Sequence, residues 1–289
     1  MFHRFLGIGL IIIAGAPLTG TSSTAQSIAS PRLYVLDGGV LESDPTRYRL
    51  QPGEVATTQL SIAAFLIVHS RGTLMWDTGA IADDDWTPTG GPVVRRLVLS
   101  NSQGRTVTLR TTLRAQLAAA GYDPAHVTFL ALSHYHWDHV ANANMFARAT
   151  WLVPAVERDA MFPQNSGPPQ PSNYAALRDS KPVILKEADH DVFGDGTVVI
   201  KPAPGHTPGH QVLYVRLART GGVVLSGDLY HYPEERTLKR LPNGETSLEE
   251  TQRSREALDA FLAKSGAQLW IQHDLTAHTK LKKAPAYYD

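Results

Sequence analysis

"LALSHYHWDHVANANMF", residues 130–146, places three histidines and an aspartate within six residues, directly after an apolar run. The run predicts a buried strand that ends where the polar residues begin. His134 and His136 alternate along a chain leaving this strand, so both imidazoles can point to the same side and bind one metal ion. Asp138 and His139 come one turn later and can bind a second ion. The segment therefore predicts part of a two-metal site.

Three other polar residues follow apolar runs farther along the chain. His206 lies in "PAPGHTPGH", Asp228 in "VVLSGDLYH" and His273 in "LWIQHD". With the first motif they give five histidines and two aspartates, enough for two adjacent divalent ions that share one carboxylate and one hydroxide. The chain has no cysteine and no GxSxG motif, so the sequence offers neither a thiol nor that serine nucleophile. Metal-dependent hydrolysis is the chemistry that this set predicts.

Strand-like apolar runs alternate with polar clusters along the whole chain, which predicts one α/β domain over residues 26–289. "AAFLIVHSRGTLMWDTG", residues 63–79, predicts a hairpin. Residues 83–104 are rich in Asp, Thr, Gly and Pro and predict a loop. A helix near the end of the chain is expected to begin after Ser247, with Glu250 in capping-box spacing, and to stop at Gly266.

The composition is that of a globular protein. Hydrophobic residues make up 43% of the 289 residues, which is ample for a packed core. Lys plus Arg equal Asp plus Glu at 27 each, and no long basic run occurs. The field that would attract a polyanion is missing, so we expect no nucleic-acid partner.

The first 25 residues have the pattern of a cleavable export signal. His3 and Arg4 precede an apolar run from Phe5 to about Ala16, and small polar residues follow as far as Ala25. The run is shorter than the roughly 20 residues that a bilayer span needs, which disfavours a stable membrane anchor. We therefore expect a signal peptide over residues 1–25 and a mature protein in the periplasm or outside the cell.

The complete motif set resembles the metallo-β-lactamase superfamily, whose signature is HxHxDH followed by a later His, a bridging Asp and a final His. "LYVLDGGV" near the N-terminus, the hairpin, "PGHTPGHQ" and "LWIQHD" are similar to the N-acyl-homoserine lactonase branch of that superfamily. The resemblance runs from about Leu33 to the C-terminus. It implies a four-layer αββα sandwich with the active site at one edge of its two sheets.

The resemblance also implies roles for individual residues. One metal ion would be held by His134, His136 and His206, the other by Asp138, His139 and His273, with Asp228 between them. Asp77 would orient a ligand histidine through its carboxylate, and His210 would support the site from outside the ligand set. The branch often forms dimers, so a homodimer is expected.

The implied activity is opening of the lactone ring of N-acyl-homoserine lactones, which is quorum quenching. Two ions lower the pKa of a bridging water to near 7 and stabilise both oxygens of the reacting ester. Asp138 would pass the proton from this nucleophile to the leaving oxygen. Zinc is the expected metal for histidine and carboxylate ligands, although cobalt, manganese or iron suit the same residues.

One position departs from the lactonase pattern. In the best-known members a tyrosine three residues after the bridging Asp donates a hydrogen bond to the substrate carbonyl, whereas this chain has His231 there, between Tyr230 and Tyr232. A protonated imidazole nitrogen can donate the same bond, so His231 is a candidate catalytic residue. The alternative is an exposed loop residue.

Substrate specificity is expected to come from the loops. Tyr230 and four other residues in loop-like stretches are candidates for an apolar acyl groove, unless they simply cap the core: Trp86, Met161, Phe162 and Tyr174. Other exported hydrolases of lactones, aryl esters or organophosphates remain alternatives. A β-lactamase is disfavoured because it does not usually carry a carboxylate ligand at the position of Asp228. A non-catalytic protein is disfavoured because all seven ligand positions are filled.

Overall fold

The computed structural model describes residues 1–3, 30–87, 90–98, 104–163, 171–180 and 182–289. Nearly all of the expected signal peptide, residues 1–25, lies outside the described residues. Among the helices that are described, none has the length and apolar character that a membrane crossing requires.

Two sheets form the centre of the molecule. The described strands of the larger sheet run in the order β4-β5-β1-β2-β3-β6-β7-β8, and those of the smaller in the order β13-β12-β11-β10-β9. The larger sheet contains β1 (Arg32–Glu42), β2 (Gln59–His69), β3 (Gly72–Trp76), β4 (Val93–Val98), β5 (Gly104–Leu109), β6 (Phe129–Ala131), β7 (Thr150–Pro154) and β8 (Val183–Leu185). The smaller contains β9 (His190–Asp191), β10 (Val198–Pro202), β11 (Gln211–Leu217), β12 (Gly221–Leu225) and β13 (Gln268–Trp270).

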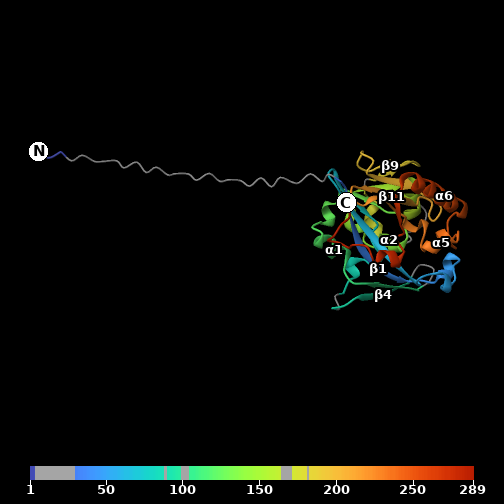
Figure 1. The fold of residues 1–289 in the computed structure, drawn as a ribbon. Coiled ribbons are helices and arrows are strands. Elements are labelled where there is room, and N and C mark those ends of the chain that lie inside the picture. Colours follow the sequence, from blue (N-terminus) through green and yellow to red (C-terminus); the bar gives the residue numbers. More distant parts are fainter. Residues whose placement is uncertain (4–29, 88–89, 99–103, 164–170, 181) are drawn as a thin grey trace.

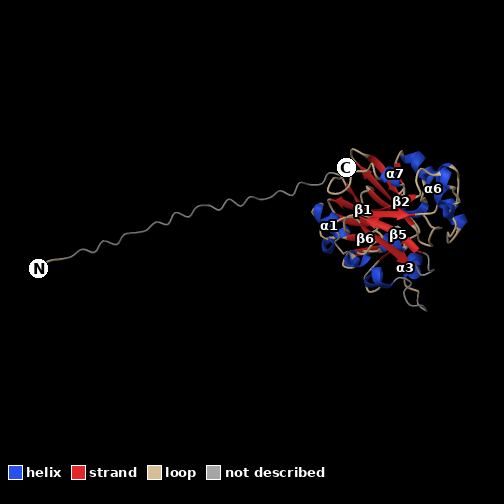
Figure 2. Cartoon of the chain, turned by 90° about the horizontal axis from the view of Figure 1, so that it is seen from below, coloured by secondary structure: helices blue, strands red, loops and turns tan. Residues whose placement is uncertain are grey.

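Helices cover the outer face of each sheet (Figures 1 and 2). The described α-helices are α1 (Leu113–Ala119), α2 (Trp137–Val140), α3 (Ala155–Met161), α4 (Pro171–Tyr174), α5 (Pro233–Thr237), α6 (Leu248–Ser265) and α7 (Leu275–His278). Both views place α1 and α6 on opposite sides of the strands. As predicted, α6 has Ser247 as its N-cap, whose side chain accepts from the Glu250 N–H, and ends at Gly266 in the left-handed conformation.

Three clusters of buried side chains separate the layers. Leu117 of α1 packs with Leu66 and Trp151 of the larger sheet in one cluster. Phe65 of the larger sheet packs with Leu213 of the smaller in a second. Val224 of the smaller sheet packs with Leu258 of α6 in a third. Helices, sheet, sheet and helix are therefore stacked in that order, which confirms the predicted αββα sandwich.

Sheet topology brings the ends of several strands to one edge. β3 pairs in parallel with β6, and β12 pairs in parallel with β13, so within each pair both carboxyl ends lie at the same edge. β10 is antiparallel to β11, which is antiparallel to β12, so β10 also ends beside β12. Every predicted metal ligand follows one of these strands. The fold thus gathers them from segments far apart in the sequence.

The stretch predicted as a loop, residues 83–104, instead contains β4, which pairs antiparallel with β5 at the edge of the larger sheet. Arg95 and Arg96 interrupt the apolar residues of β4, so neither an apolar run nor an alternating pattern marks it as a strand. Pairing with β5, rather than local sequence, makes this segment extended.

Candidate metal centre

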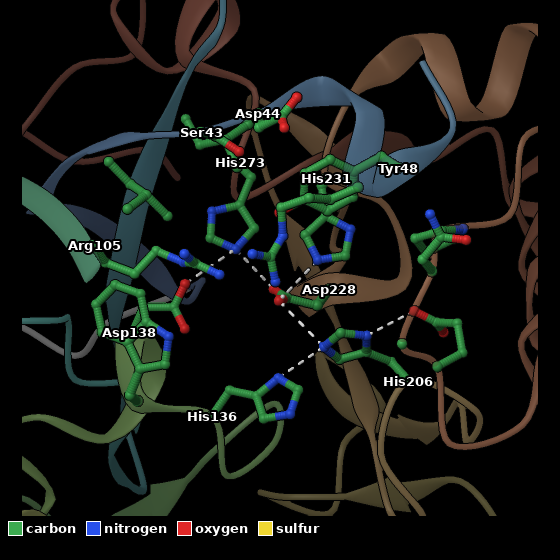
Figure 3. Close-up of a pocket in the computed structure, with 18 of the residues that line it drawn as sticks. Ser43, Asp44, Tyr48, Arg105, His136, Asp138, His206, Asp228, His231 and His273 are labelled. Atoms are coloured by element: carbon green, nitrogen blue, oxygen red, sulfur yellow. Dashed lines mark hydrogen bonds and ion pairs between the residues drawn. The ribbon is translucent and has the colours of Figure 1, made fainter. Parts of the chain in front are cut away.

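All seven predicted ligands meet in two groups that share Asp228. Figure 3 shows His136, Asp138, His206, Asp228 and His273 of this set around the cavity. In each group the candidate ligand atoms lie within 4.8 Å of one another. The first, called here the three-histidine group, contains His134, His136 and His206 with Asp228; the second, called the two-aspartate group, contains Asp138, His139 and His273 with Asp228. Each group has the membership that the family resemblance implied.

The two carboxylate oxygens of Asp228 face different groups. Its Oδ1 lies 2.9 Å from the Nε2 atoms of both His139 and His273, in the two-aspartate group. Its Oδ2 lies 3.5 Å from Nε2 of His134 and 3.4 Å from Nε2 of His206, in the three-histidine group. A single carboxylate placed in this way can contribute one oxygen to each of two adjacent ions.

Buried ligand atoms without hydrogen-bond partners test whether metal ions fit here. Among the described residues, the buried atoms that make no hydrogen bond of good geometry include Nε2 of His134, Nε2 of His139 and Oδ1 of Asp228, although the last two lie 2.9 Å apart. Buried polar atoms are rarely left unpaired in proteins, and these three all point into the centre. The imidazole and carboxylate set suits divalent transition metals. The residues therefore fit a dinuclear centre.

The surroundings of His134, His136 and Asp228 hold these side chains in the protonation states that metal binding requires. Burial, reinforced by the neighbouring histidines, holds the pKa of His134 and His136 well below the ordinary value, so both imidazoles are neutral, as a metal ligand must be. Burial would raise the pKa of Asp228, but His273, His139 and His134 hold it well below its usual range. Asp228 is therefore ionised.

Asp77 and His210 lie where the resemblance placed them. Oδ2 of Asp77 is 2.9 Å from Nδ1 of His139, so Asp77 fixes the ring whose other nitrogen faces Asp228. The same carboxylate accepts from the Ser133 N–H at 2.6 Å. Nε2 of His210 accepts a hydrogen bond from the Asp228 N–H at 2.9 Å. Its Nδ1 donates to the carbonyl oxygen of Ala203 at 3.0 Å.

Sequence reasoning missed two buried carboxylates that support the centre. Oε1 of Glu245 lies 2.9 Å from Nδ1 of His206. Glu157 accepts from the backbone N–H groups of Tyr135 and Gly209, at 2.9 and 2.8 Å. Neither glutamate belongs to a motif, and each contacts loops far away in the sequence. Only the local position of Glu157, directly after a strand, resembles the signal that identified the ligands.

His231 is buried at the centre, which excludes the alternative of an exposed loop residue. Its Nε2 lies 3.1 Å from Oδ2 of Asp228, and its backbone N–H donates to Oε1 of Glu235 at 2.9 Å. The Tyr48 ring, which the sequence did not single out, packs against the imidazole with ring centres 4.3 Å apart. His231 thus faces the reaction site from the wall of the cavity.

A cavity of about 990 Å³ opens onto both groups. The side chains that line it are mixed in character, and include the cations Arg47 and Arg105 together with Tyr48 and Tyr174. Figure 3 shows Arg105 beside Asp138. Of the residues predicted to form an acyl groove, Tyr174 lines this cavity.

The other predicted groove residues lie outside the cavity lining among the described residues. Phe162 and Met161 are buried in the cluster between the larger sheet and its helices. Trp86 packs against a cluster around Ile62, and Tyr230 is buried under α6 with Arg255 over its ring. These apolar side chains gain more by packing into the core than by lining a wet cavity, so the capping alternative holds for them.

Comparisons with known proteins show which family this chain is similar to. A model of the metallo-beta-lactamase superfamily matches residues 57–264. The chain is 31% identical over 271 residues to the N-acyl homoserine lactonase AttM of Azorhizobium caulinodans, covering 89% of this chain and 98% of AttM. It is 23% identical to AiiA, an N-acyl homoserine lactonase of Bacillus thuringiensis subsp. kurstaki, over 270 residues, again 89% and 98% of the two chains.

Solved structures of lactonases share the fold. A mutant of B. thuringiensis AiiA with N-decanoyl-L-homoserine bound at the active site superposes with a TM-score of 0.73 at 21% identity, covering 89% of this chain and 99% of that one. AidC, a dizinc quorum-quenching lactonase in complex with a product, superposes with a TM-score of 0.60 at 18% identity, covering 90% and 94%.

Proposed function

Because the chain belongs to the metallo-β-lactamase superfamily, we propose that it is a dinuclear metal-dependent hydrolase that opens the lactone ring of N-acyl-homoserine lactones. The observation that carries the proposal is the placement of Asp228, with one oxygen facing each ligand group. AttM, which matches over almost its whole length, is a lactonase and supports the substrate class. The three-histidine group would hold one ion and the two-aspartate group the other, with Asp228 contributing to both.

The protein residues would bind, orient and move protons around this centre. When bound, two divalent ions supply an activated water and stabilise the carbonyl and leaving oxygens. Asp138 lines the cavity, with Oδ2 3.7 Å from Nε2 of His273, and would carry the proton to the leaving alkoxide. Nε2 of His231 would donate a hydrogen bond to the substrate carbonyl. Zinc is the proposed metal because histidine and carboxylate ligands suit it.

The cavity also agrees with a small acylated lactone. Its volume of about 990 Å³ is at the upper end of the roughly 300–1,000 Å³ typical of small-molecule sites. Arg47, Arg105 and Tyr48 give the wall hydrogen-bond donors that could meet the amide of the acyl chain. The substrate would then be recognised by polar contacts as well as by its chain.

A substrate panel tests the proposed activity. The purified mature protein is given short- and long-chain N-acyl-homoserine lactones, aryl esters and phosphotriesters, and kcat/KM is measured for each. We expect the highest kcat/KM for a lactone. A preference for aryl esters or phosphotriesters would be consistent with a metal-dependent hydrolase but would contradict the proposed lactonase activity.

The first 25 residues support a proposal about where the protein acts. We propose that residues 1–25 are removed during export and that the mature chain acts in the periplasm or outside the cell, supported by the basic start and short apolar run. The N-terminal sequence of protein recovered from those fractions would begin near Gln26.

We also propose a homodimer, which light scattering of the mature protein would detect.

A further inference from the structure

Glu157 is a buried carboxylate in the fold that no motif marks. It lies in α3, which directly follows β7, and only 2% of its surface is exposed. Its oxygens accept from the Tyr135 N–H at 2.9 Å, the Gly209 N–H at 2.8 Å and the Thr207 hydroxyl at 2.9 Å. All three donors are neutral, so burial of this carboxylate serves these hydrogen bonds rather than an ion pair.

The donors belong to the two loops that carry the three-histidine group. Tyr135 lies between His134 and His136, and Thr207 directly follows His206. One carboxylate thus joins the loop after β6 to the loop between β10 and β11, which come from different sheets. The distance between these loops sets the distance of His206 from His134 and His136. Glu157 is therefore placed to hold these imidazoles in register.

Gly209 packs closely against α3 at the position of Glu157. A Cβ added at Gly209 would lie 2.6 Å from Cβ of Glu157, 3.0 Å from its backbone N and 3.1 Å from its Oε2. Real Cβ atoms do not approach other atoms to 2.6 Å, so only glycine at position 209 lets this loop come so close to α3. This close approach brings the Gly209 N–H within hydrogen-bonding distance of the buried Glu157 carboxylate.

The two groups also differ in charge. The two-aspartate group contains Asp138 and Asp228, whereas the three-histidine group has only the shared Asp228. Glu157 adds a carboxylate behind the three-histidine group. Burial raises its pKa to about 7, against the lowering by its hydrogen bonds from Thr207, Gly209 and Tyr135. A divalent cation nearby would favour the ionised form further.

We propose that Glu157 is a positioning residue for the ion of the three-histidine group and leaves the ion of the two-aspartate group largely unaffected. The inference rests on the dinuclear centre of the proposed function. Glu157 would touch neither substrate nor metal, and would act by holding both loops in register and by placing negative charge behind the histidines.

Glu157→Gln tests this role because it keeps the size of the side chain, removes the charge and replaces one acceptor oxygen with a donor. Loss of such a supporting residue typically weakens metal binding roughly 10- to 100-fold. After dialysis against a weak chelator, we expect the wild-type protein to retain two ions and Glu157→Gln to retain one. Anomalous scattering from crystals would show the loss at the three-histidine position. Activity should return when the metal concentration is raised.

Glu235→Gln is the matched control. Glu235 is also fully buried and accepts backbone N–H groups, but from His231 and Tyr232, which follow the shared Asp228. It pairs with Arg255 and does not join the two loops that Glu157 joins. This variant should retain both ions. Full occupancy of both positions in Glu157→Gln, or equal loss from both, would overturn the inference.

Two further variants keep the test decisive. Gly209→Ala should reproduce the selective loss, because its Cβ forces this loop and α3 apart and so breaks the hydrogen bond from the residue 209 N–H to Glu157. If Glu157→Gln does not fold, Thr207→Val removes a single hydroxyl donor and should weaken the same position less, and unchanged occupancy there would overturn the inference. A wild-type protein that binds no metal at all would instead reject the proposed function.

Discussion

At the scale of single residues, the centre depends on polar groups that would be costly to bury alone. Asp228 is 4% exposed and is approached by histidines from both ligand groups and by His231. A buried carboxylate needs such partners, because an unpaired charge in the interior costs several kcal/mol. The same arrangement that makes Asp228 tolerable in the fold makes it available to two ions.

His231→Ala tests the proposed hydrogen bond to the substrate carbonyl. Loss of one donor at a developing oxyanion lowers kcat roughly ten- to a thousandfold, and we expect a loss in that range while both metal ions remain bound. Steady-state kinetics and metal analysis of the same preparation provide the two readouts. Unchanged kcat would remove His231 from the mechanism, whereas loss of metal would show that it mainly holds Asp228 in place.

The sequence predicted the candidate ligands, and the family resemblance added Asp77 and His210 as supports, but the supports Glu157 and Glu245 were missed. The ligands were identifiable because histidine and aspartate stand at the ends of apolar runs, a pattern that local sequence displays. Glu157 and Glu245 were missed because their partners lie far away in the sequence: Glu157 is 52 residues from Gly209, and Glu245 is 39 from His206. Their roles arise from tertiary contacts that no local pattern contains.

At the scale of elements, a constant offset from strand ends explains the site. His134 lies three residues after β6, Asp228 three residues after β12 and His273 three residues after β13. The first two or three residues beyond a strand are close to the sheet edge. Asp228 and His273 converge because β12 and β13 are parallel neighbours, and His134 meets them because its sheet packs against theirs. The apolar runs therefore predicted the site even though the sequence did not display the strand order.

A buried histidine at the end of helix α7, His278, should make the stability of the fold depend on pH. His278 is its last residue and is 7% exposed. Burial, with smaller effects of Lys283 and His273, lowers its pKa to about 3. Because the unfolded chain takes up this proton near pH 6.5 and the folded chain does not, the folded state loses stability as pH falls below 6.5.

Between pH 8 and pH 5 this histidine should lower the free energy of unfolding by about 2 kcal/mol. His278→Gln cannot take up the proton, so it should lose about that much less stability over the same interval. Urea unfolding of both proteins at the two pH values measures the difference. Equal losses in wild type and variant would show that His278 accepts a proton in the folded state.

At the scale of the whole molecule, the site joins the two sheets. His134, His136, Asp138 and His139 follow a strand of the larger sheet, whereas His206, Asp228 and His273 follow strands of the smaller one. Neither sheet alone holds a complete ligand group. The layered architecture was predictable from the motif set and its family resemblance, but the edge strand β4 and the residues of the cavity wall depend on how distant segments pack.

The most direct test of the central claim is ring opening of an N-acyl-homoserine lactone by the purified mature protein before chelation, after chelation and after zinc is returned, followed by mass spectrometry. We predict that the lactone gains one water, that chelation stops the reaction and that zinc restores it. Asp228→Ala should remain folded and inactive in all three states. Ring opening that survives complete removal of metal, or intact lactone with a protein that holds two ions, would contradict the account.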